Sequence, residues 1–130
     1  MTTQRQIALA GCILGAMAVA FGAFGAHGLK SVLTVHSRIE NYELAVRYHF
    51  YHAFALLGVA ALYHHAGERC ARWSANLLVL GTLCFSGSLY LLAVLEIRAA
   101  VYITPLGGVL LIAGWLAAAW GVLNNKTPFS

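Results

Sequence analysis

The stretch IALAGCILGAMAVAFGAFGA, residues 7–26, is apolar throughout and carries no charged side chain. An α-helix rises about 1.5 Å per residue and the hydrocarbon layer of a bilayer is about 30 Å thick, so such a run is long enough to cross it. A lone segment in lipid can satisfy its backbone amides only as a helix. Ala18-Val19-Ala20 would suit signal-peptide cleavage, but the length of the run and the single Arg5 before it favour a retained span.

The composition of the whole chain points to the same solvent. Of its 130 residues, 61% are hydrophobic and 9% are charged, whereas soluble domains have roughly a quarter of their residues charged. Lipid must therefore cover most of the surface. The formal charge of +4 comes from Lys and Arg residues that stand apart from one another, with no basic run. We therefore expect these cations to meet membrane lipid headgroups, and we expect no nucleic-acid partner.

Three further runs can cross the membrane. Residues 73–95 and 105–123 are clear cases, while residues 44–65 are weaker because Arg47, His49 and His52 lie near their beginning. The arginine can extend to the interface and the histidines can face protein, so this run still counts as a span. The sequence predicts an all-α integral membrane four-helix bundle with short loops, in which residues 1–130 form a single transmembrane domain with spans at 7–26, 44–65, 73–95 and 105–123.

Helix ends carry their own patterns. Ser37 and Glu40 fit a capping box, which predicts that the second long helix begins near position 38. Gly67 is typical of the residue that ends a helix. Thr104 followed by Pro105 predicts a cap and a proline at the first helical position.

Residues 28–43, between the first two spans, mix apolar and polar side chains. Their spacing favours a short helix on the membrane surface, and a loop packed over the bundle is the alternative.

Four spans place both termini on one side of the membrane. Four cations lie on each side: Arg5, Arg69, Arg72 and Lys126 with the termini, and Lys30, Arg38, Arg47 and Arg98 opposite. Counting Arg47 as embedded breaks the tie, so we expect cytoplasmic termini.

Polar side chains and glycines from all four spans fall at similar depths on the side opposite the termini. This placement predicts a shallow pocket for a ligand, lined by His27, His49, His52, Ser86, Ser88, Tyr90 and Thr104. The alternative is helix packing, in which small residues allow close approach while His and Tyr bond across the interface. The glycines expected to serve packing are Gly11, Gly15, Gly22, Gly25, Gly87, Gly107, Gly108 and Gly114.

Metal binding and catalysis are weaker interpretations. His49 and His52 lie one turn apart, and with His27 they could bind copper, zinc or a haem iron. However, the third and fourth spans contain no histidine, no carboxylate is embedded, and the three cysteines show no CxxC spacing. A serine nucleophile beside His52 would lack an acidic partner. We therefore expect no metal, no cofactor and no enzymatic activity.

Five blocks of this chain resemble one family. They are Gly22-Ala23-Phe24-Gly25-Ala26-His27-Gly28-Leu29, Tyr48 with His52-Ala53, Phe85-Ser86-Gly87-Ser88-Leu89-Tyr90, Ile103-Thr104-Pro105-Leu106-Gly107-Gly108, and Gly114-Trp115. The family is that of uncharacterised small membrane proteins that includes bacterial YgdD and the animal transmembrane protein two-five-six. The resemblance covers residues 11–120 and implies a four-span protein of the inner membrane, with no established activity. His49 stands where the family more usually has Gln, which argues against a metal site at this position throughout the family.

Three functions remain open from the sequence. The first is a non-catalytic accessory or scaffold subunit that packs through its glycine-rich faces against a larger membrane complex or a second copy of itself. The second is a protein that binds a lipid, a quinone or another amphipathic small molecule in the predicted pocket. The third is a haem- or metal-binding redox subunit.

Overall fold

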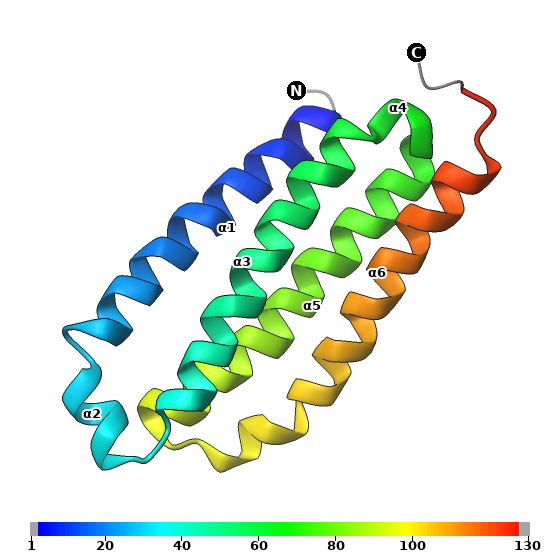
Figure 1. Ribbon diagram of the computed structural model, residues 1–130. Helices are drawn as coiled ribbons and strands as arrows, with labels where there is room; N and C mark the ends of the chain where they lie inside the picture. The colour runs from blue at the N-terminus through cyan, green and yellow to red at the C-terminus, as the bar shows by residue number, and fades with distance from the viewer. Residues whose placement is uncertain (1–2, 128–130) are drawn as a thin grey trace.

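Four long antiparallel helices lie side by side in the computed structural model, which describes residues 3–127 (Figure 1). They are α1 (Thr3–Ala26), α3 (Ile39–Ala61), α5 (Glu68–Leu95) and α6 (Thr104–Asn124). Short helices occupy the connections: α2 (Lys30–Val35), α4 (Tyr63–Ala66) and the 3-10 helix η1 (Arg98–Tyr102). The predicted all-α bundle is confirmed.

The helices pack in the spatial order α1, α3, α5, α6. Extensive contacts join α1 to α3, α3 to α5 and α5 to α6, whereas α1 and α5 meet over only a few residues. Leu56 and Leu78, whose side chains are fully buried in the core, come from the two central helices. Each outer helix therefore has one face against the bundle and leaves most of its apolar surface open.

Three segments of the described chain are long and apolar enough to cross a membrane: Thr3–Ala26, Glu68–Leu95 and Arg98–Asn124. They correspond to three of the four predicted spans. Helix α3 falls outside this group because Arg47, His49 and His52 lower its mean hydropathy.

The predicted capping box is wrong. Helix α3 begins at Ile39 after an N-cap at Arg38, and no side chain caps it. Ser37 has a φ of 54°, which is left-handed. An N-cap serine normally takes an extended conformation, and here Ser37 instead forms the turn between α2 and α3.

The cap at Thr104 is also wrong by one position. Ile103 is the N-cap of α6, so Thr104 is the first helical residue and Pro105 follows it in the first turn. The Thr104 hydroxyl instead lies 2.7 Å from that of Ser88 on α5. A contact between helices has taken the place of the local cap.

Gly67 ends a helix as predicted, with a φ of 76° that favours glycine. Before it, the chain breaks once at Leu62, so the segment predicted as one span consists of α3 followed by α4.

Helix α2 lies in the segment where a short helix was predicted. Leu33 is 1% exposed and packs against Tyr42 of α3 and Ala93 of α5. His36, directly after the helix, places its Nδ1 atom 3.1 Å from the Ala93 carbonyl oxygen. These contacts fix α2 across the ends of α3 and α5, at the opposite end of the bundle from the start of α1 and the end of α6 (Figure 1).

Candidate functional site

The polar residues predicted to share one pocket do not do so. His49, Ser86 and Tyr90 line a small cavity of about 80 Å³, whereas His52 lines a different and larger groove. His27 is exposed directly after the end of α1 and lines neither space. The single pocket is therefore a wrong prediction, because neighbouring turns of one helix face different partners.

His52 is fully hydrogen-bonded and has a structural role. Its Nδ1 atom donates to the Tyr48 carbonyl oxygen at 2.7 Å, and a carbonyl can only accept, so Nδ1 carries the proton. The Trp115 indole then donates to Nε2 at 3.3 Å. This pair joins α3 to a point about midway along α6.

His49 is bonded on one side only. Its Nδ1 lies 3.2 Å from the Tyr90 hydroxyl, while Nε2 is buried and has no partner within residues 3–127. If Tyr90 donates to Nδ1, only the Nε2 proton is left without an acceptor. In the other tautomer Nδ1 donates to the Tyr90 oxygen, so the Nε2 lone pair has no donor and the Tyr90 proton has no acceptor. Two unpaired buried groups cost more free energy than one. We therefore assign a donor to Nε2.

The remaining predicted hydroxyls tie helices together. Ser86 donates to the Ala45 carbonyl oxygen of α3 at 2.8 Å. Ser88 contacts the Phe85 carbonyl oxygen at 2.9 Å as well as Thr104. These hydroxyl groups therefore form hydrogen bonds within and between the helices.

The side chains that could bind a metal ion do not come together in one site. Within the described chain no three His, Cys, Asp or Glu side chains lie close enough to hold an ion. His49 and His52 line separate spaces and His27 lines neither, so the three histidines considered from the sequence do not share one site.

The predicted packing glycines differ in how closely they approach other helices. A Cβ atom at Gly107 would overlap the backbone nitrogen of Phe85, and one at Gly25 would overlap the Tyr42 ring. Added carbons would lie 3.0 Å from the Ala53 carbonyl oxygen at Gly11 and 2.8 Å from Leu78 at Gly114.

The other predicted glycines are less constrained. Gly15, Gly22 and Gly108 would make ordinary contacts, and Gly87 faces open space. Sequence reasoning missed Gly81 and Gly121, which lie close to Leu111 and to the Ala66 carbonyl oxygen.

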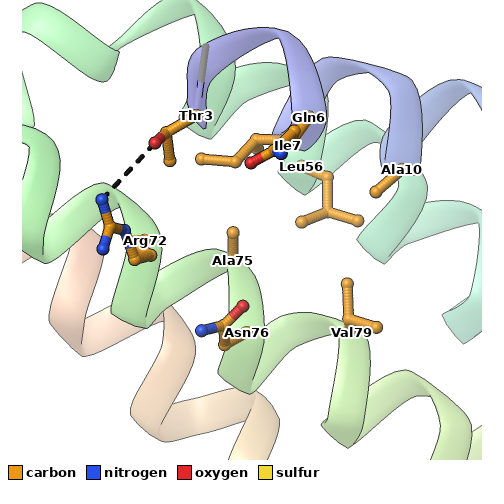
Figure 2. A pocket seen from close by; sticks show the side chains of 9 residues that line it. All are labelled: Thr3, Gln6, Ile7, Ala10, Leu56, Arg72, Ala75, Asn76 and Val79. Atoms are coloured by element: carbon orange, nitrogen blue, oxygen red, sulfur yellow. Dashed lines mark hydrogen bonds between the residues drawn. The ribbon is translucent and has the colours of Figure 1, made fainter. Parts of the chain in front are cut away.

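Sequence reasoning also missed a polar cavity of about 460 Å³ between α1 and α5, shown in Figure 2. Gln6 projects toward it from α1 and Asn76 lies on its α5 wall, with Leu56 of α3 behind them. Arg72 donates to the Thr3 hydroxyl at 3.5 Å across the opening and also pairs with Glu68. Asn76, an amide inside the apolar run 73–95, was the feature that could have revealed this cavity.

This cavity and the small His49 cavity lie along the same two helices. The lining positions recur every three or four residues, so they form one stripe on each helix. The stripe runs through Thr3, Ile7, Ala10, Leu14, Met17 and Phe21 on α1, and through Arg72, Ala75, Asn76, Val79, Thr82, Leu83, Ser86 and Tyr90 on α5. We call the two cavities together the α1/α5 crevice, and the polar end of the larger one the mouth.

A separate groove of about 500 Å³ lies between α3 and α6, over Phe85 of α5. We call it the α3/α6 groove. Four of its side chains are aromatic or imidazole rings from α3 or α5, and the rest come from α6: Tyr48, Tyr51, His52 and Phe85, then Gly108, Leu111, Ile112 and Trp115. It shares no lining residue with the α1/α5 crevice.

Comparison with known proteins places the chain in a family. A family profile described as a protein of unknown function, DUF423, matches residues 21–108. The chain belongs to this family. It is 41% identical to a UPF0382 membrane protein of Staphylococcus saprophyticus, over 93% of this chain and 99% of that protein. It is 36% identical to the UPF0382 inner membrane protein YgdD of Escherichia coli K12, over 95% of this chain and 94% of YgdD.

The family membership confirms the predicted resemblance and the membrane location, and YgdD is an inner membrane protein by name. No solved structure matches the chain. The DUF423 match includes His49, His52 and Ser88 and ends at Gly108.

Proposed function

We propose that this small membrane protein binds an amphipathic small molecule of the bilayer, most simply a lipid, in the α1/α5 crevice. The observation that carries the proposal is a cavity with a polar mouth and apolar walls directly beyond it. Gln6, Arg72 and Asn76 supply hydrogen-bond donors at the mouth. Ile7, Ala10 and Val79 supply apolar walls directly beyond them.

The charge at this end of the molecule favours an anionic headgroup. The terminal end carries four basic side chains, Arg5, Arg69, Arg72 and Lys126, and one acidic side chain, Glu68, among residues 3–127. The opposite end has as many cations but three carboxylates, Glu40, Glu43 and Glu96. Basic groups near a membrane surface attract anionic lipid, so the mouth lies at the more positive end.

The loose contact between α1 and α5 supports a chain-shaped occupant. These helices meet over few residues although both pack on α3, which leaves room for an acyl chain along the stripe.

The buried Nε2 donor of His49 lies further along the same crevice. The small cavity beside it, about 80 Å³, has room for about two waters at roughly 30 Å³ each.

Retention of lipid by crevice variants tests the proposal. The protein is reconstituted into nanodiscs of equal parts phosphatidylglycerol and phosphatidylcholine, extracted into detergent, and its bound lipid is measured by mass spectrometry. Val79→Phe fills the crevice and should lower retained phosphatidylglycerol at least severalfold. Val109→Phe adds the same side chain at a position of α6 that is 63% exposed, and should retain lipid as the parent does. Equal lipid content in both variants would contradict the proposal.

All four long helices cross the bilayer under this proposal, with α3 as the fourth span. Two observations support it: α3 packs between α1 and α5, which are both long apolar helices, and its 23 residues extend about 34 Å. Helix α2 then lies at the interface, with Leu33 turned inward and Val35, 81% exposed, turned away from the bundle. Cysteines placed singly at positions 35 and 126 and labelled with an impermeant maleimide should react from opposite sides of the membrane.

An accessory role in a larger assembly is the second candidate, and it would be non-catalytic. The hydroxyls of Ser86 and Ser88 bond backbone carbonyls rather than His52, which supports a role without chemistry. Several glycines expected to face partners pack inside the chain instead. The outer face of α6 is the best remaining surface for a partner subunit or a second copy, with Leu106, Val109, Ile112, Leu116, Trp120 and Leu123 exposed along it.

Cross-linking from this face separates association from simple contact with lipid. A photoreactive side chain at position 116 should give one reproducible protein adduct in native membranes if α6 docks a subunit. Adducts to lipid alone would contradict the accessory role, while lipid binding in the α1/α5 crevice would remain possible.

A further inference from the structure

The α3/α6 groove has a chemistry of its own. We propose that it binds a planar, lipid-soluble ring that carries carbonyl oxygens, as a quinone headgroup does. The site shares no residue with the α1/α5 crevice, so the two proposals can fail separately.

Size distinguishes this groove from the cavity at His49. A cavity of about 150 Å³ is known to accept benzene, and small-molecule sites commonly measure about 300–1,000 Å³. The α3/α6 groove, at about 500 Å³, lies within that range. The His49 cavity, at about 80 Å³, is too small for a ring unless its walls move.

The walls suit a flat ring better than an acyl chain. Tyr48 stacks on Phe85 with ring centroids 4.5 Å apart and planes 28° apart, and Tyr48 also adjoins the rings of Tyr51 and His52. Aromatic rings gain from offset and edge-to-face contacts with another ring, a gain that a saturated chain cannot supply. Trp115 forms the α6 wall and is 51% exposed, so its indole is accessible to an incoming ring.

His52 holds that wall in place without offering a free group. Both of its ring nitrogens are used, one by the Tyr48 carbonyl and one by the Trp115 indole. The bond to Nε2 limits the rotation of Trp115, so His52 is a positioning residue.

Two hydroxyls supply the preference for a carbonyl. Tyr48 and Tyr51 both line the groove, and neither hydroxyl bonds to another residue in the described part of the chain. A phenol that lines an apolar groove gains most from an acceptor on the ligand. A ring with carbonyl oxygens therefore fits better than an apolar ring of the same size.

Gly108 keeps the groove open. A Cβ atom there would meet only the Phe85 ring, at 3.9 Å, so a larger side chain would extend into the groove. Gly87 on α5 offers a matched control, because nothing lies within 4 Å of its added carbon. Both glycines are helical, so leucine at either position favours helix formation.

Quenching of Trp115 fluorescence by decylubiquinone tests the site. Trp73→Phe and Trp120→Phe leave Trp115 as the only indole, and the purified protein in detergent is titrated with the quinone. The parent and Gly87→Leu should show saturable quenching. Gly108→Leu should weaken the apparent affinity at least tenfold. Linear, unsaturable quenching that is equal in all three proteins would overturn the proposal, because it reports only partition of quinone into the micelle.

Two further arms test the chemistry of recognition. Decylbenzene, which has the same tail and no carbonyl, should displace the quinone only weakly, and Tyr51→Phe should lower the affinity for the quinone several-fold. Equal displacement by decylbenzene would overturn the preference for an acceptor. His52→Leu should lower the fluorescence anisotropy of Trp115 in the absence of quinone; an unchanged anisotropy would overturn the positioning role of His52.

Discussion

The two outer helices are held in different ways. Helix α6 approaches the backbone of its neighbours: Gly107 lies against Phe85 of α5, and Gly121 against the Ala66 carbonyl of α4. Helix α1 is held mainly by side chains, since Gly25 adjoins the Tyr42 ring and Gly11 adjoins Leu57 as well as the Ala53 carbonyl. A contact between backbones can yield only if a helix moves, whereas a side chain can rotate. Helix α6 is therefore held more rigidly than α1.

The two histidines of α3 also differ according to which outer helix they lie beside. His52, beside α6, has partners for both nitrogens, while His49, beside α1, has an unpartnered Nε2. The completed hydrogen bonds lie on the side with close helix packing. The unpaired Nε2 donor of His49 lies along the α1/α5 crevice.

Gly107→Ala tests the contact at α6 and should have the largest effect. Its new carbon overlaps the Phe85 backbone, so α5 and α6 must separate. We expect a loss of about 2–3 kcal/mol in the free energy of unfolding, as for overpacked cores. Unfolding in mixed micelles with increasing denaturing detergent measures it.

The control for this variant is Gly87→Ala, which faces open space and should be neutral or slightly stabilising. Equal losses at the two glycines would mean that the α5–α6 backbone contact does not hold α6.

Gly25→Ala tests the contact at α1 and should cost less. The added carbon displaces the Tyr42 ring, whose hydroxyl donates to the Phe21 carbonyl oxygen at 2.6 Å. Because a ring can move where a backbone cannot, we expect a loss of about 1–2 kcal/mol. If the ring is displaced, adding Tyr42→Phe should cost little more, which a double-mutant cycle measures. Full additivity would show that Tyr42 keeps its bond.

His52→Leu and His49→Leu compare the two histidines directly. The first leaves the Trp115 indole without its acceptor, and a loss of about 1 kcal/mol follows. The second leaves the Tyr90 hydroxyl without its acceptor but also removes the buried unpaired Nε2 donor. These two effects oppose each other, so the change should be close to zero. The same unfolding measurement serves both. A larger loss at His49 would show that its Nε2 bonds a water or ligand that stabilises the fold.

Ser88→Ala should cost less than His52→Leu. The Ser88–Thr104 pair joins α5 to the start of α6, and hydrogen bonds between membrane helices average about 0.6 kcal/mol. Thr104→Val should cost a similar amount, and the double variant should cost no more than either alone. Independent losses would show that the two hydroxyls act separately.

Local patterns predicted much of the fold. The apolar runs located the long helices, and Gly67 marked a helix end, because these features depend on neighbouring residues along one helix. The cap at Thr104 failed because its hydroxyl contacts Ser88 of another helix, and the cap at Ser37 failed because this residue takes a left-handed conformation in the turn before α3. Asn76 was visible as a polar residue in an apolar run, but only the position of α1 shows that it faces Gln6 across a cavity.

The sequence by itself determined that this chain belongs in lipid as a set of long helices, because hydropathy and helix length are properties of each segment alone. Only the tertiary structure decided that His49 and His52 face different spaces, that Gly107 rather than Gly87 lies against a neighbouring backbone, and that Tyr48, Phe85 and Trp115 line one groove. Those outcomes depend on the rotation of each helix about its axis. That rotation is set by packing among all four helices at once, and no single segment encodes it.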